Sequence, residues 1–173
     1  INIDGTPNGY YVYTMDGATI SNCYYKGANW DKNKQMSVFR ADTDFNGESY
    51  AADWLLGKGK GTIVANIFNA DSKWKVYAVE GGVKTEMTRL QSTPGQDAFA
   101  VGYHKKYAVA NKYNFFSKQN GYLKMNHWYS YIPKDANAVI TIEATDPFGN
   151  TYTASSKDAV TEPFYNYAHY YGK

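Results

Sequence analysis

The sequence predicts an all-β protein, an antiparallel immunoglobulin-like β-sandwich of about seven to nine strands with long loops and little helix. Short runs in which apolar and polar residues alternate recur along the chain, and turn-forming residues separate them. The 18 tyrosines among 173 residues support this prediction, because tyrosine suits the pleated, half-buried surface of a sheet. A closed β-barrel is the main rival architecture, since it shares these patterns.

The first predicted hairpin joins residues 11–15 to residues 18–21. Asp16-Gly17 lies between the two runs, and both positions of a two-residue hairpin turn favour residues that tolerate positive φ. Cys23 follows in an alternating segment and is the only cysteine, so it cannot form an intramolecular disulfide. We interpret it as a small buried hydrophobic residue.

Strands are predicted next at residues 35–39 and 62–68, the second of them ending in an Asn69–Asp71 turn. A hairpin then covers residues 74–88 and turns at Glu80-Gly81-Gly82. Its first strand should place the side chains of Trp74, Val76 and Ala78 on one face of the sheet.

The last predicted hairpin joins residues 139–145 to residues 151–155 across the loop Asp146–Asn150, which contains proline and glycine. The helical signal is weak and is confined to residues 49–56. Residues 91–120 lack a sustained period, and we expect long loops there with some strand at 98–102. With no repeat or linker to divide it, the chain is predicted to form a single domain over residues 1–173.

Composition argues against two classes of partner. The net charge is +2, from 18 basic and 16 acidic side chains, so there is no concentrated basic surface for nucleic acid. No stretch approaches the roughly 20 apolar residues that membrane insertion requires. We therefore expect neither nucleic-acid binding nor membrane insertion.

One loop has the spacing of a calcium site. An acidic or amide side chain occupies positions 1, 3, 5 and 12 of the loop that starts at Asp42, and Gly47 occupies position 6, where a sharp turn is needed. A solvated Asp/Asn/Gly turn would look similar, so both interpretations stay open. The candidate calcium ligands are Asp42, Asp44, Asn46, Glu48 and Asp53.

The tail from residue 162 to residue 173 is unusually aromatic. It would serve as an edge strand that covers apolar surface, as a docking segment for a partner, or as a platform that stacks on sugar rings, because apolar surface rarely stays exposed without a contact. The candidate binding residues are Phe164, Tyr165, Tyr167, Tyr170 and Tyr171.

Several motifs occur in the order found in one known family. They are Asp4–Tyr10, Gln35-Met36, Ala65–Asp71, Trp74–Val76 followed by Glu80–Val83, Met87–Arg89, His127-Trp128 and Ala144–Ala154. With these motifs the chain resembles the C-terminal domain of bacterial calcineurin-like phosphoesterases over about residues 4–155. Residues 40–61 look like an insertion, and the aromatic tail at 162–173 also departs from the family pattern.

The resemblance implies an accessory β-sandwich that follows a metallophosphoesterase catalytic domain in the same polypeptide. It also implies export by a Gram-negative bacterium, and hence an extracytoplasmic location in the periplasm or at the cell surface. The upstream catalytic domain is then the expected partner.

The sequence gives no sign of catalysis in this segment. Calcineurin-like enzymes hold two metal ions with Asp-x-His, Gly-Asp-x-x-Asp, Gly-Asn-His and Gly-His-x-His motifs, and none of these occurs here. The histidines His104, His127 and His169 are isolated from one another. We expect a non-catalytic domain without cofactors, apart from a possible structural calcium ion. The alternative is a carbohydrate- or cell-surface-binding module with a glycan or protein partner, which the aromatic surplus suggests.

Overall fold

The computed structural model describes eight parts of the chain, and every regular element in them is a β-strand. Within these parts no helix is long and apolar enough to cross a lipid bilayer. Residues 44–45, 48–49, 93–95 and 123–125 are described as backbone only. The described residues are 5–28, 30–40, 44–45, 48–49, 61–90, 93–95, 123–125 and 127–157.

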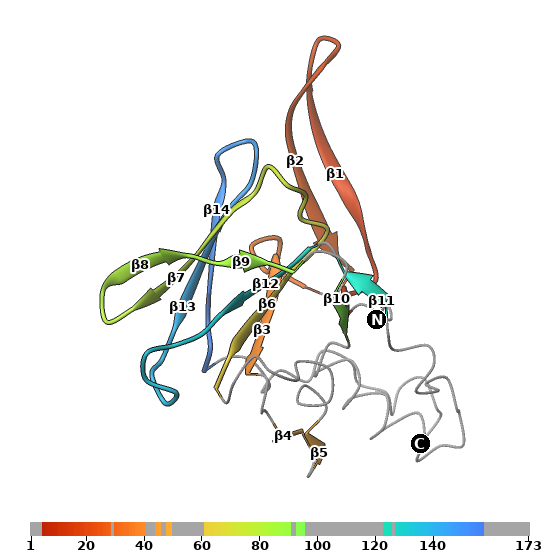
Figure 1. The fold of residues 1–173 in the computed structure, drawn as a ribbon. Coiled ribbons are helices and arrows are strands. Elements are labelled where there is room, and N and C mark those ends of the chain that lie inside the picture. Colours follow the sequence, from red (N-terminus) through yellow and green to blue (C-terminus); the bar gives the residue numbers. More distant parts are fainter. Residues whose placement is uncertain are drawn as a thin grey trace, which may run out of the picture.

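Two four-stranded antiparallel sheets form the body of the molecule (Figure 1). In spatial order, the first sheet contains β3 (Met36–Arg40), β6 (Ile63–Ile67), β12 (Trp128–Tyr131) and β9 (Thr88–Arg89). The second contains β14 (Thr151–Ser155), β13 (Thr141–Thr145), β7 (Lys75–Glu80) and β8 (Val83–Glu86). As described, the sheets share no strand, which supports the predicted sandwich rather than a closed barrel. The immunoglobulin-like topology stays a prediction.

The remaining strands pair in twos outside these sheets. The longest pair is the hairpin of β1 (Gly9–Asp16) and β2 (Thr19–Gly27), which projects well beyond the sandwich (Figure 1). The short pairs are β4 (Asp44–Phe45) with β5 (Glu48–Ser49), and β10 (Thr93–Gly95) with β11 (Leu123–Met125).

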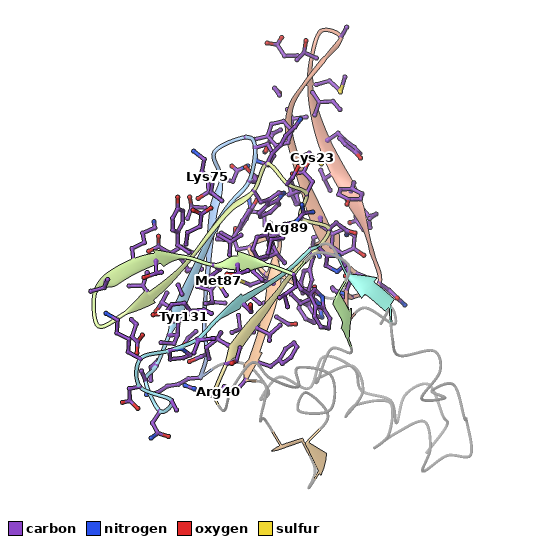
Figure 2. The ribbon with its side chains drawn as sticks, in the orientation of Figure 1. Cys23, Arg40, Lys75, Met87, Arg89 and Tyr131 are labelled. Atoms are coloured by element: carbon purple, nitrogen blue, oxygen red, sulfur yellow. The ribbon has the colours of Figure 1, made fainter. Side chains whose placement is uncertain are left out.

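The inward faces of the two sheets enclose one apolar core, because alternate residues of each strand point to the same side. Figure 2 shows Met87 among the side chains between the sheets and Lys75 on the outside. Trp74 packs against this core from its edge, so the predicted face of Trp74, Val76 and Ala78 is confirmed. The buried core residues are Met36, Val38, Ile63, Ala65, Ile67, Ala70, Val76, Ala78, Met87, Tyr129, Ile140, Ile142 and Ala144.

Strand β6 is buried on both faces. Its inward side chains join the core, and its outward side chains Val64 and Asn66 are fully buried as well. On the same outward face Phe39 and Trp128 meet edge to face, with ring centroids 5.8 Å apart. This double burial explains why β6 is nearly continuous in apolar residues, whereas β13 alternates.

The predicted hairpin turns are present, one of them displaced by a residue. Gly81 and Gly82 both take positive φ, 55° and 81°, as the predicted Gly-Gly turn requires. In the first hairpin Asp16 pairs with Thr19, so the turn is Gly17-Ala18 and not Asp16-Gly17. Only its glycine takes positive φ, 58°, which is the pattern of a type II′ turn with glycine in first place.

The other predicted strands match β3, β6, β13 and β14 to within two residues. The expected turn after β6 is confirmed at Asn69, whose φ is 58°. One short strand, β10, falls inside the segment that was expected to be loop. The predicted helical turn at 49–56 and the strand at 98–102 lie outside the described residues, apart from Ser49 in β5.

Two charged side chains hold the connection between β12 and β13 from opposite sheets. From β3, the Arg40 guanidinium donates to the carbonyls of Ala136 and Ala138. From β7, the Glu80 carboxylate accepts hydrogen bonds from the Tyr131 hydroxyl at 2.6 Å and from the backbone N–H groups of Lys134 and Asp135, both at 3.0 Å. The connection is thus fixed to both layers of the sandwich.

We predict that Glu80→Gln lowers stability in a pH-dependent way. The N–H of Asp135 lowers the pKa of Glu80, and the Tyr131 hydroxyl and the N–H of Lys134 lower it further. A lowered pKa stabilises the fold above the usual glutamate value of about 4.3, and this contribution is lost as the pH falls through the folded value. Melting temperatures of the two proteins should therefore differ near neutral pH and converge in acid.

The matched control is Glu86→Gln on β8, where the side chain is exposed and receives none of these donors among the described residues. It should change the melting temperature less than Glu80→Gln at neutral pH. Equal effects of the two substitutions would contradict the role assigned to Glu80.

We also predict that Ile142→Ala lowers the free energy of unfolding by about 2–5 kcal/mol, because it leaves a cavity between the sheets. The Ile142 side chain is fully buried, whereas Val139 is 45% exposed. The control Val139→Ala should stay within about 0.5 kcal/mol of the parent. Denaturant unfolding of the three proteins measures both values, and a small effect of Ile142→Ala would contradict the sandwich core.

Candidate functional site

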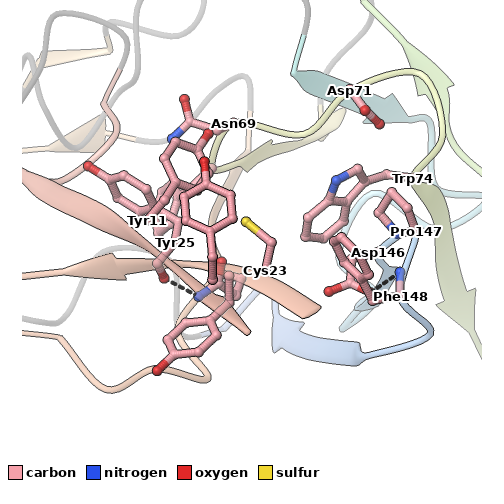
Figure 3. Close-up of a pocket in the computed structure, with 13 residues that line it drawn as sticks. Tyr11, Cys23, Tyr25, Asn69, Asp71, Trp74, Asp146, Pro147 and Phe148 are labelled. Atoms are coloured by element: carbon pink, nitrogen blue, oxygen red, sulfur yellow. Dashed lines mark hydrogen bonds between the residues drawn. The ribbon is translucent and has the colours of Figure 1, made fainter. Parts of the chain in front are cut away.

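A groove of about 340 Å³ lies between the β1–β2 hairpin and the sandwich (Figure 3). The hairpin forms one wall, and the loops after β6 and after β13 form the opposite wall. We call it the aromatic groove, because seven of its lining residues are aromatic. It is lined by Tyr11, Tyr13, Cys23, Tyr24, Tyr25, Gln35, Phe68, Asn69, Asp71, Trp74, Asp146, Pro147 and Phe148.

The hairpin wall follows from the alternation of β1. Tyr11 and Tyr13 are two residues apart and so share a face, opposite Tyr25 and Cys23 of β2. The rings of Tyr11 and Tyr13 lie side by side, with centroids 5.9 Å apart and planes tilted by 32°. They remain 44% and 53% exposed, so this face of the hairpin offers two neighbouring aromatic surfaces to solvent.

The floor of the groove is rigid. The buried hydroxyl of Tyr25 donates to the carbonyl of Pro7 at 2.5 Å, and the Gln35 amide donates to the carbonyl of Tyr25 at 2.5 Å. Phe68 donates its N–H to the carbonyl of Gln35 at 2.9 Å, and its ring lies between those of Tyr25 and Trp30. These contacts fix the base of the hairpin to the end of β6.

Asp146 shapes the opposite wall. Its Oδ1 accepts the N–H groups of Phe148 and Asn150, each at 2.9 Å, and its Oδ2 accepts the Asn150 side-chain amide at 2.8 Å. This is how aspartate forms a tight turn with its own backbone. The Asn150 amide also donates to Oδ1 of Asn22 on β2 at 2.8 Å, so the same turn is tied to the hairpin.

The loop after β6 supplies polar groups at the rim. Asn69 takes positive φ there, and Oδ1 of Asp71 accepts the N–H of Lys73 at 2.8 Å. Trp74 stacks on Tyr152, with ring centroids 6.0 Å apart and planes 27° apart. One face of the indole is therefore used inside the protein, and Trp74 also lines the groove (Figure 3).

The groove is acidic, and the Tyr11 hydroxyl in its wall stays protonated. Among its described lining residues, two are aspartates and none is lysine, arginine or histidine. Partial burial raises the pKa of Tyr11 to about 12, with further contributions from its neighbours, including Asp71. Burial and the nearby Asp146 carboxylate raise the pKa of Tyr152 to about 12. The hydroxyls of these two tyrosines are thus neutral donors and acceptors at physiological pH.

Cys23 is half-buried and lines the groove, so its interpretation as a small buried hydrophobic residue is corrected. The reason is that the hairpin leaves the sandwich, so its inner face is covered only in part. Burial raises the pKa of the Cys23 thiol, and the charge of Asp146 raises it further. A raised pKa lowers the thiolate fraction, which does not suit a nucleophile.

The structure does not test the predicted calcium site. Asp42, Asn46 and Asp53 lie outside the described residues, whereas Asp44 and Glu48 belong to the paired strands β4 and β5 by their backbone alone. Among the residues that were described, no three acidic, histidine or cysteine side chains are grouped as metal ligands. Calcium binding stays a prediction.

The predicted aromatic platform in the tail, with Phe164, Tyr165, Tyr167, Tyr170 and Tyr171, also lies outside the described residues. The aromatic groove was not among the predicted sites. Its residues come from segments far apart in the sequence. The available signals were the spacing of Tyr11 and Tyr13 by two residues and the Asp146–Asn150 loop, which the sequence had indicated only as a turn.

Comparison with known protein families gives a match over most of the chain. Residues 1–152 match the family described as "C terminal of Calcineurin-like phosphoesterase". No curated protein and no solved structure matches the chain. The match covers most of the 173 residues and includes the hairpin, the first sheet, the second sheet up to Tyr152 in β14, and every described residue that lines the aromatic groove. The chain therefore belongs to the family of C-terminal domains of calcineurin-like phosphoesterases.

Proposed function

We propose that this domain is a non-catalytic accessory module of an exported calcineurin-like metallophosphoesterase. The hydrolase activity would reside in a catalytic domain that precedes it in the same polypeptide. The family match over residues 1–152 is the observation that carries the proposal, because the family is defined as the C-terminal part of such enzymes.

The chemistry of the groove is consistent with this role. Phosphoester hydrolysis by calcineurin-like enzymes requires two metal ions that stabilise the attacking and leaving oxygens. The four metal-binding motifs of these enzymes do not occur in the sequence. The two aspartates of the groove, Asp71 and Asp146, would repel a phosphoester, and Asp146 already uses both oxygens in its own turn.

The projecting hairpin is the surface that we assign to the contact with the catalytic domain. Near its tip Met15 pairs with Ile20, and these side chains are 55% and 44% exposed. Exposed apolar side chains grouped on one element commonly mark a contact with another protein surface, and domain interfaces of this kind are modest in area.

We predict that the purified chain does not hydrolyse p-nitrophenyl phosphate or bis(p-nitrophenyl) phosphate in the presence of manganese or zinc. Release of p-nitrophenol measures this directly. The positive control is a calcineurin-like enzyme with an intact two-metal site, assayed under the same conditions. Metal-dependent turnover by residues 1–173 would refute the non-catalytic role.

A further inference from the structure

The aromatic groove selects against anionic ligands. Asp71 and Asp146 line it, and no described lining residue carries a positive charge. An anion inside the groove would lose its hydration and meet like charge, so phosphates and acidic sugars are disfavoured. The ligand class that remains is neutral or cationic.

The shape of the aromatic wall favours a flat ligand. Tyr11 and Tyr13 present adjacent rings on one face of β1, with planes 32° apart, and we call these two rings the platform, which a ligand would meet from the hairpin side of the groove. A cation would be held best where rings and free carboxylate oxygens surround it. Asp146 offers no such oxygen, because its carboxylate already accepts three hydrogen bonds from its own loop and one from the Tyr152 hydroxyl. Only Oδ2 of Asp71 remains for a ligand.

Hydrogen-bonding groups line the same groove as this platform. The Asn69 side chain makes no hydrogen bond with the described residues, and Asp71 uses one carboxylate oxygen, Oδ1, for the Lys73 N–H. The raised pKa of Tyr11 keeps its hydroxyl protonated. Amide, carboxylate and phenol groups beside an aromatic surface suit a ligand with hydroxyls on its edge and C–H groups on its face.

We propose that the aromatic groove binds a neutral oligosaccharide, with a sugar ring stacked on Tyr11 and Tyr13 and its hydroxyls bound by Asn69 and Asp71. The volume of about 340 Å³ is at the small end for ligand sites, so one or two sugar units fit inside. The rigid floor at Tyr25 reduces the ordering that binding requires.

This binding goes beyond the accessory role and does not depend on the activity of any catalytic domain. The full 173-residue chain is tested on an array of unmodified glucans, galactans, mannans and xylans of two to six units, with acidic oligosaccharides and a lysine-rich peptide alongside. The strongest neutral glycan is then titrated by calorimetry. We expect binding to neutral glycans that persists at high salt, and weaker or no binding to acidic ones.

Three variants locate the site. Tyr13→Ala removes a ring of the platform, and Asn69→Gly removes the amide while glycine keeps the positive φ of this position. Each should weaken binding by about tenfold or more. The matched control is Tyr10→Ala, on the same strand and similarly exposed but on the opposite face, and it should leave the affinity unchanged.

Several outcomes would overturn the proposal. They are no binding to any neutral glycan, binding that survives both Tyr13→Ala and Asn69→Gly, and preferred binding to a lysine-rich peptide that disappears with salt. The last outcome would identify a cationic ligand instead. Thermal unfolding of each variant checks that the fold is intact, and Asn69→Gly keeps the test decisive if Tyr13→Ala unfolds. A hydrolytically active chain would refute the accessory role and leave these outcomes unaffected.

Discussion

The apolar layer between β6 and the paired strands β7 and β13 is the constraint on which the rest of the structure depends. Burial of these inward faces fixes the register of β7 against β13, since a shift by one residue would turn every core side chain outward. In that register Lys75 pairs with Thr145. Trp74 and Asp146 come directly before and after this pair, so core packing alone makes them neighbours in the groove wall.

Polar contacts position the β1–β2 hairpin, which the apolar core does not fix. The hairpin lies outside the apolar layer, and long-range hydrogen bonds determine its position: Tyr25 to Pro7, Gln35 to Tyr25 and Asn150 to Asn22. The partners are 18, 10 and 128 residues apart in the sequence, and the first two bonds are buried, where an unmade hydrogen bond is costly. The groove therefore exists because the hairpin is held beside the sandwich without being packed into it.

The strands could be predicted because their signals are local. Alternation, Gly81-Gly82 and the Asp146–Asn150 loop act within a few residues, and the structure follows them closely. The exact turn at Gly17-Ala18 could not be predicted, because a bulge near Ser21 shifts the register and sequence gives no simple sign of it. The groove could not be predicted from the sequence either, because it depends on how loops that are distant in the sequence lie in space.

The partial burial of Cys23 illustrates the same limit. An alternating segment indicates which side chains share a face, but it does not indicate whether that face meets a core, a groove or solvent. The tyrosine surplus was equally ambiguous: Tyr25 is buried in the floor, whereas Tyr13 is half-exposed on the wall. The family match is consistent with both uses of tyrosine, because it covers the residues of the fold and those of the groove together.

The position of β8 has a consequence for self-association. As described, it is the outer strand of its sheet, next to β7, and such a strand can pair with another copy of the chain. All four of its residues are exposed, and two of them, Lys84 and Glu86, are charged. Lys84 also pairs with Glu143 and lies over the Tyr77 ring. An approaching strand would have to desolvate these charges, so this edge resists the edge-to-edge stacking that leads sandwiches to aggregate.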